Sequence, residues 1–270
     1  MRPIYIIVIS TLIASLASCI ETVDPKDIGG SEEKVVVNGF LSPDDTVVSI
    51  EVSRSKPVIG KHQNLSKYDY IINNATVLLE NEAGDVATLN YNTQSYKYET
   101  APANMPIVSG QSYYLTVQVG GKSYTASCQI PKAKVGNISF KRQGSGTSSS
   151  QLSFSFDDIE GEDSYYRIGG SMIDDFSNYP LYFDLQGFQT DAAGDGSRIT
   201  ATADYSFRQA DSVEIRVANV EEILYRYQYS SYNYYGDDPF SEPVIYPSNI
   251  EGGLGIFAGY QLTLQKIKIQ

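Results

Sequence analysis

The sequence predicts a mainly β protein in two parts, an immunoglobulin- or fibronectin-like β-sandwich followed by a second β-rich lobe with one helix. Three observations support this. Short runs of alternating apolar and polar residues recur along most of the chain, Gly, Asn and Asp clusters separate them, and only one segment has apolar residues at helical spacing. We therefore expect the sandwich at 34–131 and the second lobe at 132–270.

The expected sandwich consists of short strands joined by turns. A Ser-Pro-Asp-Asp cluster at 42–45 separates the first two runs, and the dipeptide Gly120-Gly121 marks the turn of a later hairpin. Short strands connected in this way are typical of a sandwich of about 100 residues. The expected strands along this part of the chain are 35–41, 46–53, 75–80, 86–91, 113–119 and 123–130.

The second lobe begins with more strands and contains the single helical pattern. Asn219 and Glu222 have the spacing of a capping box, and the apolar residues that follow recur at helical spacing. We expect a helix at about 220–234, which the Gly-Asp-Asp-Pro sequence at 236–239 would end. The expected strands of this lobe are 138–140, 151–157, 165–172, 212–217 and 255–264.

The N-terminus has the layout of a secretory signal peptide, with Arg2 followed by a short apolar run. That run is shorter than the roughly 20 residues that a transmembrane helix needs. It ends in Leu16-Ala17-Ser18-Cys19, which resembles a bacterial lipobox. We expect 1–18 to be removed and Cys19 to carry acyl chains; an ordinary signal peptide with a chance cysteine is the alternative.

The residues after the expected lipidation site form an acidic segment without apolar periodicity. We expect 19–33 to be a flexible tether between lipid and folded body. The net charge is −12, and removal of Arg2 with the signal peptide makes the mature chain more acidic still. Nucleic acids and anionic lipid surfaces attract an excess of Lys and Arg, so net charge argues against both as electrostatic partners.

Residues for the common catalytic centres are scarce. His62, the only histidine, lies in a polar stretch without a motif, so a Ser-His-Asp, Cys-His or zinc centre is not expected. With Cys19 committed to lipid, Cys128 has no partner for an internal disulfide and fits a buried apolar position. The acidic stretch 157–163 could offer calcium ligands but is better explained as a solvated loop. We expect no cofactor, no metal site and no enzymatic activity; a glycan hydrolase with paired carboxylates is an alternative, although no motif selects two acids.

The region of the expected helix has the most unusual composition of the chain, because tyrosines crowd into it. Their rings could stack on a sugar or a peptide, or could pack the helix onto the sheet. The candidate ligand-binding residues are Tyr225, Tyr227, Tyr229, Tyr232, Tyr234 and Tyr235.

Several segments resemble one known family. They are Asp238-Pro239-Phe240-Ser241-Glu242-Pro243-Val244, the run from Ser248 to Tyr260, Leu224-Tyr225-Arg226-Tyr227, and the N-terminal run from Val36 to Pro43. Together they resemble the domain of unknown function 4249, a family of Bacteroidota lipoproteins. The resemblance covers nearly all of the mature chain, except that 188–211 is short and polar here.

The resemblance implies a role rather than a reaction. Members of the family are often encoded beside TonB-dependent outer-membrane transporters, and no catalytic residues carry over from them. We therefore expect an outer-membrane lipoprotein, on the periplasmic or cell-surface face, that acts as an accessory or binding subunit of such a transporter. The alternatives are an envelope glycan hydrolase and a purely structural surface lipoprotein. The glycines Gly252, Gly253 and Gly255 are expected to permit positive φ or close backbone approach at the start of the last strand.

Overall fold

The computed structural model describes residues 33–56, 66–143, 150–173, 181–205, 212–232 and 246–268. The expected signal peptide, Cys19 and most of the tether lie outside these residues, as do Tyr234 and Tyr235. The described part is mainly β with one α-helix, which confirms the predicted fold class. None of the helical segments in the described ranges is long and apolar enough to cross a bilayer.

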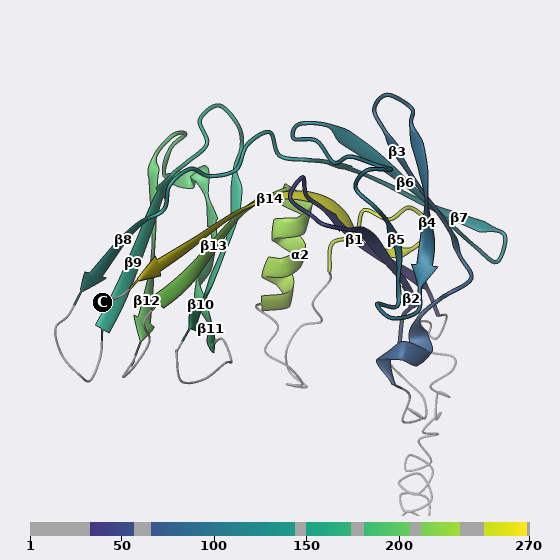
Figure 1. Ribbon diagram of the computed structural model, residues 1–270, viewed down its shortest axis with the longest axis horizontal. Helices are drawn as coiled ribbons and strands as arrows, with labels where there is room; N and C mark the ends of the chain where they lie inside the picture. The colour runs from purple at the N-terminus through teal and green to yellow at the C-terminus, as the bar shows by residue number, and fades with distance from the viewer. Residues whose placement is uncertain are drawn as a thin grey trace, which may run out of the picture. The chain divides into compact units, whose positions relative to one another are not determined.

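The described elements follow in chain order, and Figure 1 labels the strands and the α-helix. They are β1 (Val35–Leu41), β2 (Val48–Arg54), η1 (Lys67–Tyr70), β3 (Thr76–Asn81), β4 (Val86–Asn92), β5 (Lys97–Thr100), β6 (Ser112–Val119), β7 (Lys122–Gln129), β8 (Ser139–Gln143), β9 (Ser150–Asp157), β10 (Tyr165–Ile173), β11 (Leu181–Thr190), η2 (Asp191–Ala193), β12 (Arg198–Tyr205), β13 (Ser212–Val220), α2 (Glu222–Tyr232) and β14 (Leu254–Lys268).

The long last strand, β14, joins the two halves of the chain. Its first part pairs in parallel with β1, with Leu41 opposite Gly259. Its second part pairs antiparallel with β13, with Val220 opposite Tyr260. Eleven strands thereby form one continuous sheet in the order β11-β10-β13-β14-β1-β2-β5-β4-β3-β6-β7. Figure 1 shows β14 running from β1 to β13.

The N-terminal strands fold around one apolar core. Buried side chains of β1, β2 and β3 to β7 meet there, together with Phe257 from β14. The segment before β14 also contributes, because Glu251 bridges to Thr125 of β7 and the Glu251 N–H donates to the Thr125 carbonyl oxygen at 2.8 Å. The predicted part 34–131 therefore folds together with residues 249–259 from the far end of the chain.

The C-terminal half has its own core between two sheets. Strands β9, β8 and β12 form a separate three-stranded sheet. Phe154 and Phe156 of β9 pack with Tyr166 of β10 and with the buried valines and isoleucine of β13. The Phe156 and Tyr166 rings meet edge to face with centroids 5.0 Å apart. Burial of these rings from both sheets stabilises the lobe.

Glycine is required where β14 enters the N-terminal sheet. Gly252 and Gly255 have φ angles of +79° and +112°. A Cβ atom at Gly255 would lie 2.0 Å from the Val37 carbonyl oxygen, and one at Gly253 would lie 2.8 Å from the Val35 carbonyl oxygen. The expected structural role of these glycines is confirmed, since the close parallel pairing with β1 leaves no room for side chains.

Most predicted strands are present, and the helix begins later than expected. Asn219 and Val220 belong to β13, so the helix begins at Glu222 instead of about 220, and Asn219 is no N-cap. The Asn219 amide instead donates to the Ala133 carbonyl oxygen at 3.1 Å. Three described strands were not predicted, namely β5, β11 and β12.

We predict that Gly255→Ala lowers the free energy of unfolding by about 2–4 kcal/mol, because it adds strain at a positive φ and a clash with the β1 backbone. Urea denaturation followed by circular dichroism measures the change. Gly136→Ala is the matched control, since a Cβ there meets nothing within 4 Å. Equal effects of the two substitutions would contradict the proposed constraint.

Candidate functional site

Glu221 holds the start of α2 at the point where β14 changes partners. One carboxylate oxygen accepts the Gln129 N–H at 2.7 Å, and the other accepts the Gly259 N–H at 2.5 Å. Its backbone carbonyl accepts N–H groups from Leu224 and Tyr225 in the first turn of α2. Burial raises the pKa of Glu221, against the two backbone hydrogen bonds, which lower it. Glu221 thus connects β7, β14 and α2.

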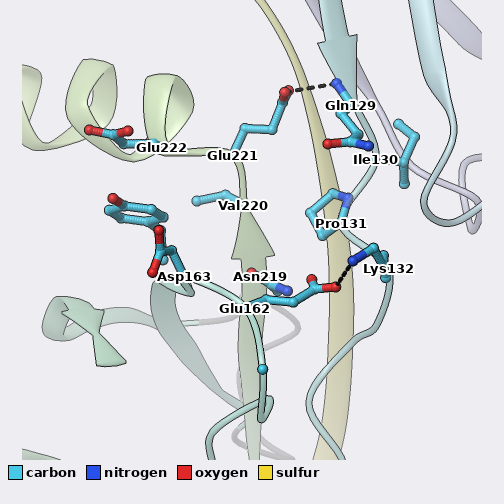
Figure 2. Close-up of a pocket in the computed structure, with 12 residues that line it drawn as sticks. Gln129, Ile130, Pro131, Lys132, Glu162, Asp163, Asn219, Val220, Glu221 and Glu222 are labelled. Atoms are coloured by element: carbon cyan, nitrogen blue, oxygen red, sulfur yellow. Dashed lines mark hydrogen bonds and ion pairs between the residues drawn. The ribbon is translucent and has the colours of Figure 1, made fainter. Parts of the chain in front are cut away.

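A pocket of about 450 Å³ lies around Glu221 and is lined by acidic residues (Figure 2). We call Glu221 and its two backbone hydrogen bonds the clamp. Four carboxylates line this acidic pocket, those of Glu162, Asp163, Glu221 and Glu222. Glu162 pairs with Lys132 at 2.6 Å, and both oxygens of Glu221 are committed to backbone N–H groups. A general acid or base needs an oxygen that can reach a substrate, so the buried carboxyl here serves structure.

The outer face of β14 carries α2. Ile256 and Ala258 are fully buried there and pack with Leu224 of the helix. Phe257, between them, points to the opposite face and enters the core of the N-terminal strands. Because the described part of α2 packs mainly on β14 and β10, it stands as a wall beside the outer face of β1 and β2.

One face of α2 packs its tyrosines against Phe188 of β11. The Phe188 ring lies edge-on to Tyr225 and Tyr229, with centroids 5.4 and 5.3 Å away, and 5.5 Å from Tyr232. The Tyr225 and Tyr229 rings are stacked, 6.0 Å apart. These residues recur at i, i+4 and i+7, which places them on one side of a helix. We call this set the ring cluster.

Tyr227 points to the other side of α2 and helps to form an aromatic groove of about 480 Å³. The floor of the groove is the outward face of the sheet, and its walls are Tyr227 and Tyr260. Phe40 and Val47 in the groove remain 39% and 43% exposed, so their apolar surfaces are accessible to a ligand. The lining residues are Asn38, Phe40, Asp45, Val47, Ser49, Glu51, Lys97, Tyr227 and Tyr260.

The aromatic walls of the groove are held in place. The Tyr260 hydroxyl donates to Asp45 at 2.7 Å, and the other Asp45 oxygen accepts the Ser42 N–H at 2.8 Å. Burial and the bond to Asp45 raise the pKa of Tyr260, so the phenol remains a donor. Burial raises the pKa of Asp45, although the hydrogen bonds from Tyr260 and Ser42 lower it. The Tyr227 ring rests against Tyr246 with centroids 5.7 Å apart.

Two charged side chains in the groove are available to a ligand. Glu51 of β2 and Lys97 of β5 lie on neighbouring strands and line the same pocket. In the described ranges, neither has an ion pair or a side-chain hydrogen bond. The groove therefore combines aromatic surface with an unpaired acid and an unpaired base.

The acidic stretch 157–163 is engaged with protein groups. Asp157 pairs with Arg198 at 2.8 Å. The buried Asp158 accepts the Tyr166 hydroxyl at 2.6 Å and the Gly196 N–H at 3.0 Å. Burial and the bond to Asp158 raise the pKa of Tyr166 to about 12. Across the described residues, no three His, Cys, Asp or Glu side chains gather as metal ligands would.

The structure thus separates the tyrosines that the sequence grouped as candidate ligand-binding residues. Tyr225, Tyr229 and Tyr232 belong to the ring cluster, and Tyr227 lines the aromatic groove. The sequence did not reveal that Phe40 and Tyr260 lie beside Tyr227. The sequence indicated that β1 is a strand, but it did not indicate that β1 pairs with the distant β14.

These features define a β-rich protein with an aromatic groove beside α2. Residues 20–266 match the model of the family described as Domain of unknown function (DUF4249), and the chain belongs to this family. No curated protein is significantly similar to the chain in sequence.

We predict that Glu221→Ala lowers the free energy of unfolding by about 2–3 kcal/mol, because it leaves two backbone N–H groups without their acceptor. The matched control, Glu222→Ala, removes an exposed pair with Arg226 and should change stability by less than about 0.5 kcal/mol. Denaturant unfolding of both variants measures the difference, and a larger loss for the control would refute the clamp.

The pH dependence of this contribution follows from the raised pKa of Glu221. A carboxyl whose pKa is higher in the folded state stabilises the fold most below its unfolded pKa of 4.5. Its contribution declines as pH rises through the folded pKa. The stability difference between the wild type and Glu221→Ala should therefore be larger at acidic than at neutral pH.

Proposed function

We propose that this chain is a lipid-anchored cell-envelope protein that binds a ligand in the aromatic groove, as accessory or binding subunit of a TonB-dependent outer-membrane transporter. The observation that carries the binding role is the groove itself, where Phe40, Tyr227 and Tyr260 surround an unpaired acid and base. Its volume of about 480 Å³ lies within the range of ligand sites, about 300–1,000 Å³.

The ligand that fits these walls best is a sugar ring. Aromatic faces stack on flat apolar surfaces, while Asn38, Ser49 and Glu51 on the floor of the groove offer polar groups to hydroxyls. Because Tyr260 and Tyr227 are fixed by Asp45 and Tyr246, little conformational entropy is lost on binding. A peptide that binds instead would correct the ligand class and keep the binding role.

The anchoring and the partner are supported by the sequence. The Leu-Ala-Ser-Cys pattern at 16–19 supports acylation of Cys19, and two or more acyl chains give durable attachment. The transporter partnership is supported by the gene neighbourhood common in the family. The glycan hydrolase alternative gains no support from Glu221 in the acidic pocket, because both of its oxygens accept backbone N–H groups.

We predict that Cys19→Ala abolishes incorporation of radiolabelled palmitate and moves the protein from the membrane to the soluble fraction. Cys128→Ala is the matched control. Because the Cys128 thiol is buried in β7, its removal should leave labelling unchanged.

Mild-detergent extraction of the lipidated protein, followed by mass spectrometry, identifies its partner. A stoichiometric TonB-dependent transporter would support the accessory role, and recovery of the chain alone would contradict it.

We predict that the double substitution Phe40→Ala and Tyr227→Ala weakens binding of the best ligand from an oligosaccharide screen by at least about tenfold, because stacking of each ring contributes roughly 1 kcal/mol. Isothermal titration calorimetry measures the affinity. Tyr232→Ala, in the ring cluster outside the groove, is the control and should bind normally. The groove is not the binding site if the control loses as much affinity.

A further inference from the structure

One end of the N-terminal sheet carries exposed tyrosines and more basic than acidic side chains, although the protein as a whole is acidic. At this end the chain enters β1 through Lys34, directly after the segment that follows Cys19 in sequence. The Lys34 N–H donates to the Ser55 hydroxyl at 3.0 Å, and Ser53 bridges to Ile71 just after η1. We call this end, formed by residues 34–35, 53–55, 66–71 and 93–96, the tether end.

Two exposed tyrosines meet at the tether end. Tyr68 of η1 and Tyr96 of the β4–β5 turn are 47% and 38% exposed, and their ring centroids lie 4.4 Å apart. The Lys67 amine lies 5.0 Å from the centre of the Tyr68 ring. Exposed tyrosine beside lysine is the combination that sits at the boundary between lipid and water, with the ring in the interface and the amine at the headgroups.

The backbone at Tyr96 is strained. Its φ angle is +59°, which the described chain otherwise shows only at glycines. A bulky side chain with such a φ is an outlier that costs about 1 kcal/mol or more. Glycine or asparagine would occupy this turn at lower free energy. The presence of tyrosine therefore indicates a use for an exposed ring at this position.

The local charge is opposite to that of the whole chain. The sequence carries 32 acids against 20 Lys and Arg. At the tether end, Lys34, Arg54 and Lys67 are exposed, against Asp69 within it and the exposed Glu33 immediately before it. The Asp69 carboxylate is engaged in capping η1, where it accepts the Ser66 N–H at 2.7 Å. The net charge of the chain argues against an anionic partner, but cations outnumber acids at this end.

The length of the tether limits the distance of this end from the membrane. Residues 19–33 number 15, and a chain of that length spans at most about 50 Å when fully extended. An acylated Cys19 would therefore hold Lys34 within a few nanometres of lipid headgroups. At that distance a cationic, tyrosine-bearing surface meets the bilayer repeatedly.

We propose that the tether end is a second membrane contact, in which Tyr68 and Tyr96 enter the interface and Lys34 and Lys67 lie against anionic headgroups. This inference rests on the proposed anchoring, since the acyl chains bring the surface to the bilayer. The contact fixes the orientation of the domain, so that the sheet stands on the membrane by this end.

The test uses the chain from residue 19 onward with Cys19→Ala, which keeps every described residue and removes the lipid. We expect it to sediment with vesicles of phosphatidylcholine and phosphatidylglycerol, but not with phosphatidylcholine alone, and to dissociate at high salt. The double variant Tyr96→Asn and Lys67→Glu should bind at least about tenfold more weakly. Because asparagine tolerates this φ, the variant should melt no lower than the starting protein.

A matched control carries the same changes elsewhere. Tyr114, also 47% exposed, and the exposed Lys122 belong to β6 and β7, away from the tether end, so Tyr114→Asn with Lys122→Glu should bind normally. Equal loss in the control, or no binding of the unlipidated chain to anionic vesicles, overturns the proposal. Binding that emerges only after deletion of 20–32 also overturns it, since the acidic tether then covers the surface. Palmitate labelling of Cys19 tests the anchor independently of all these outcomes.

Discussion

The parallel pairing of β14 with β1 is the constraint on which the rest of the structure depends. One strand serves two neighbours in succession, and the change of partner falls between Gly259 and Tyr260. At this point the Glu221 carboxylate binds the Gly259 N–H and the Tyr260 hydroxyl binds Asp45. The backbones also approach closely, since a Cβ at Gly259 would lie 2.5 Å from the Gln129 carbonyl oxygen. A few residues of β14 and their partners therefore hold the N-terminal and C-terminal halves of the chain together.

The aromatic groove is a consequence of the same arrangement. The backbone of β14 alternates its side chains, so Phe257 enters the core while Ile256 and Ala258 receive α2 on the opposite face. The described part of α2 lies on β14, so outward residues of β1 and β2 remain in contact with solvent. The wall of the groove is thus anchored to the sheet through apolar burial, and its floor is the sheet itself. A site on such elements is rigid before any ligand arrives.

The sequence predicted the parts of this fold that depend on local pattern. The hairpins of β3 with β4 and β6 with β7 were visible because alternation and turn glycines lie within a few residues of each other. Strand β5 was missed because four residues give little periodicity, and β12 because its region, 188–211, looked polar. Strand β11 was missed although Leu181, Phe183 and Leu185 alternate along it. The groove could not be predicted, since Phe40, Tyr227 and Tyr260 meet only through the pairing of the first and last strands. One feature of the site could be predicted from helical spacing alone. This spacing places Tyr227 on the side of α2 opposite Tyr225 and Tyr229.

The use of the last strand to complete the first has a consequence for biosynthesis. Until residues 254–259 are available, β1 has an unpaired edge and the core lacks Phe257, so the N-terminal half cannot close. Contacts of such long sequence separation form slowly. For a chain that crosses a membrane in extended form, as the proposed lipoprotein would, this delay keeps the polypeptide threadable until its end has been delivered. A prematurely terminated chain would keep an open strand edge, which exposes it to proteases and aggregation. Only a full-length chain can therefore reach the folded state.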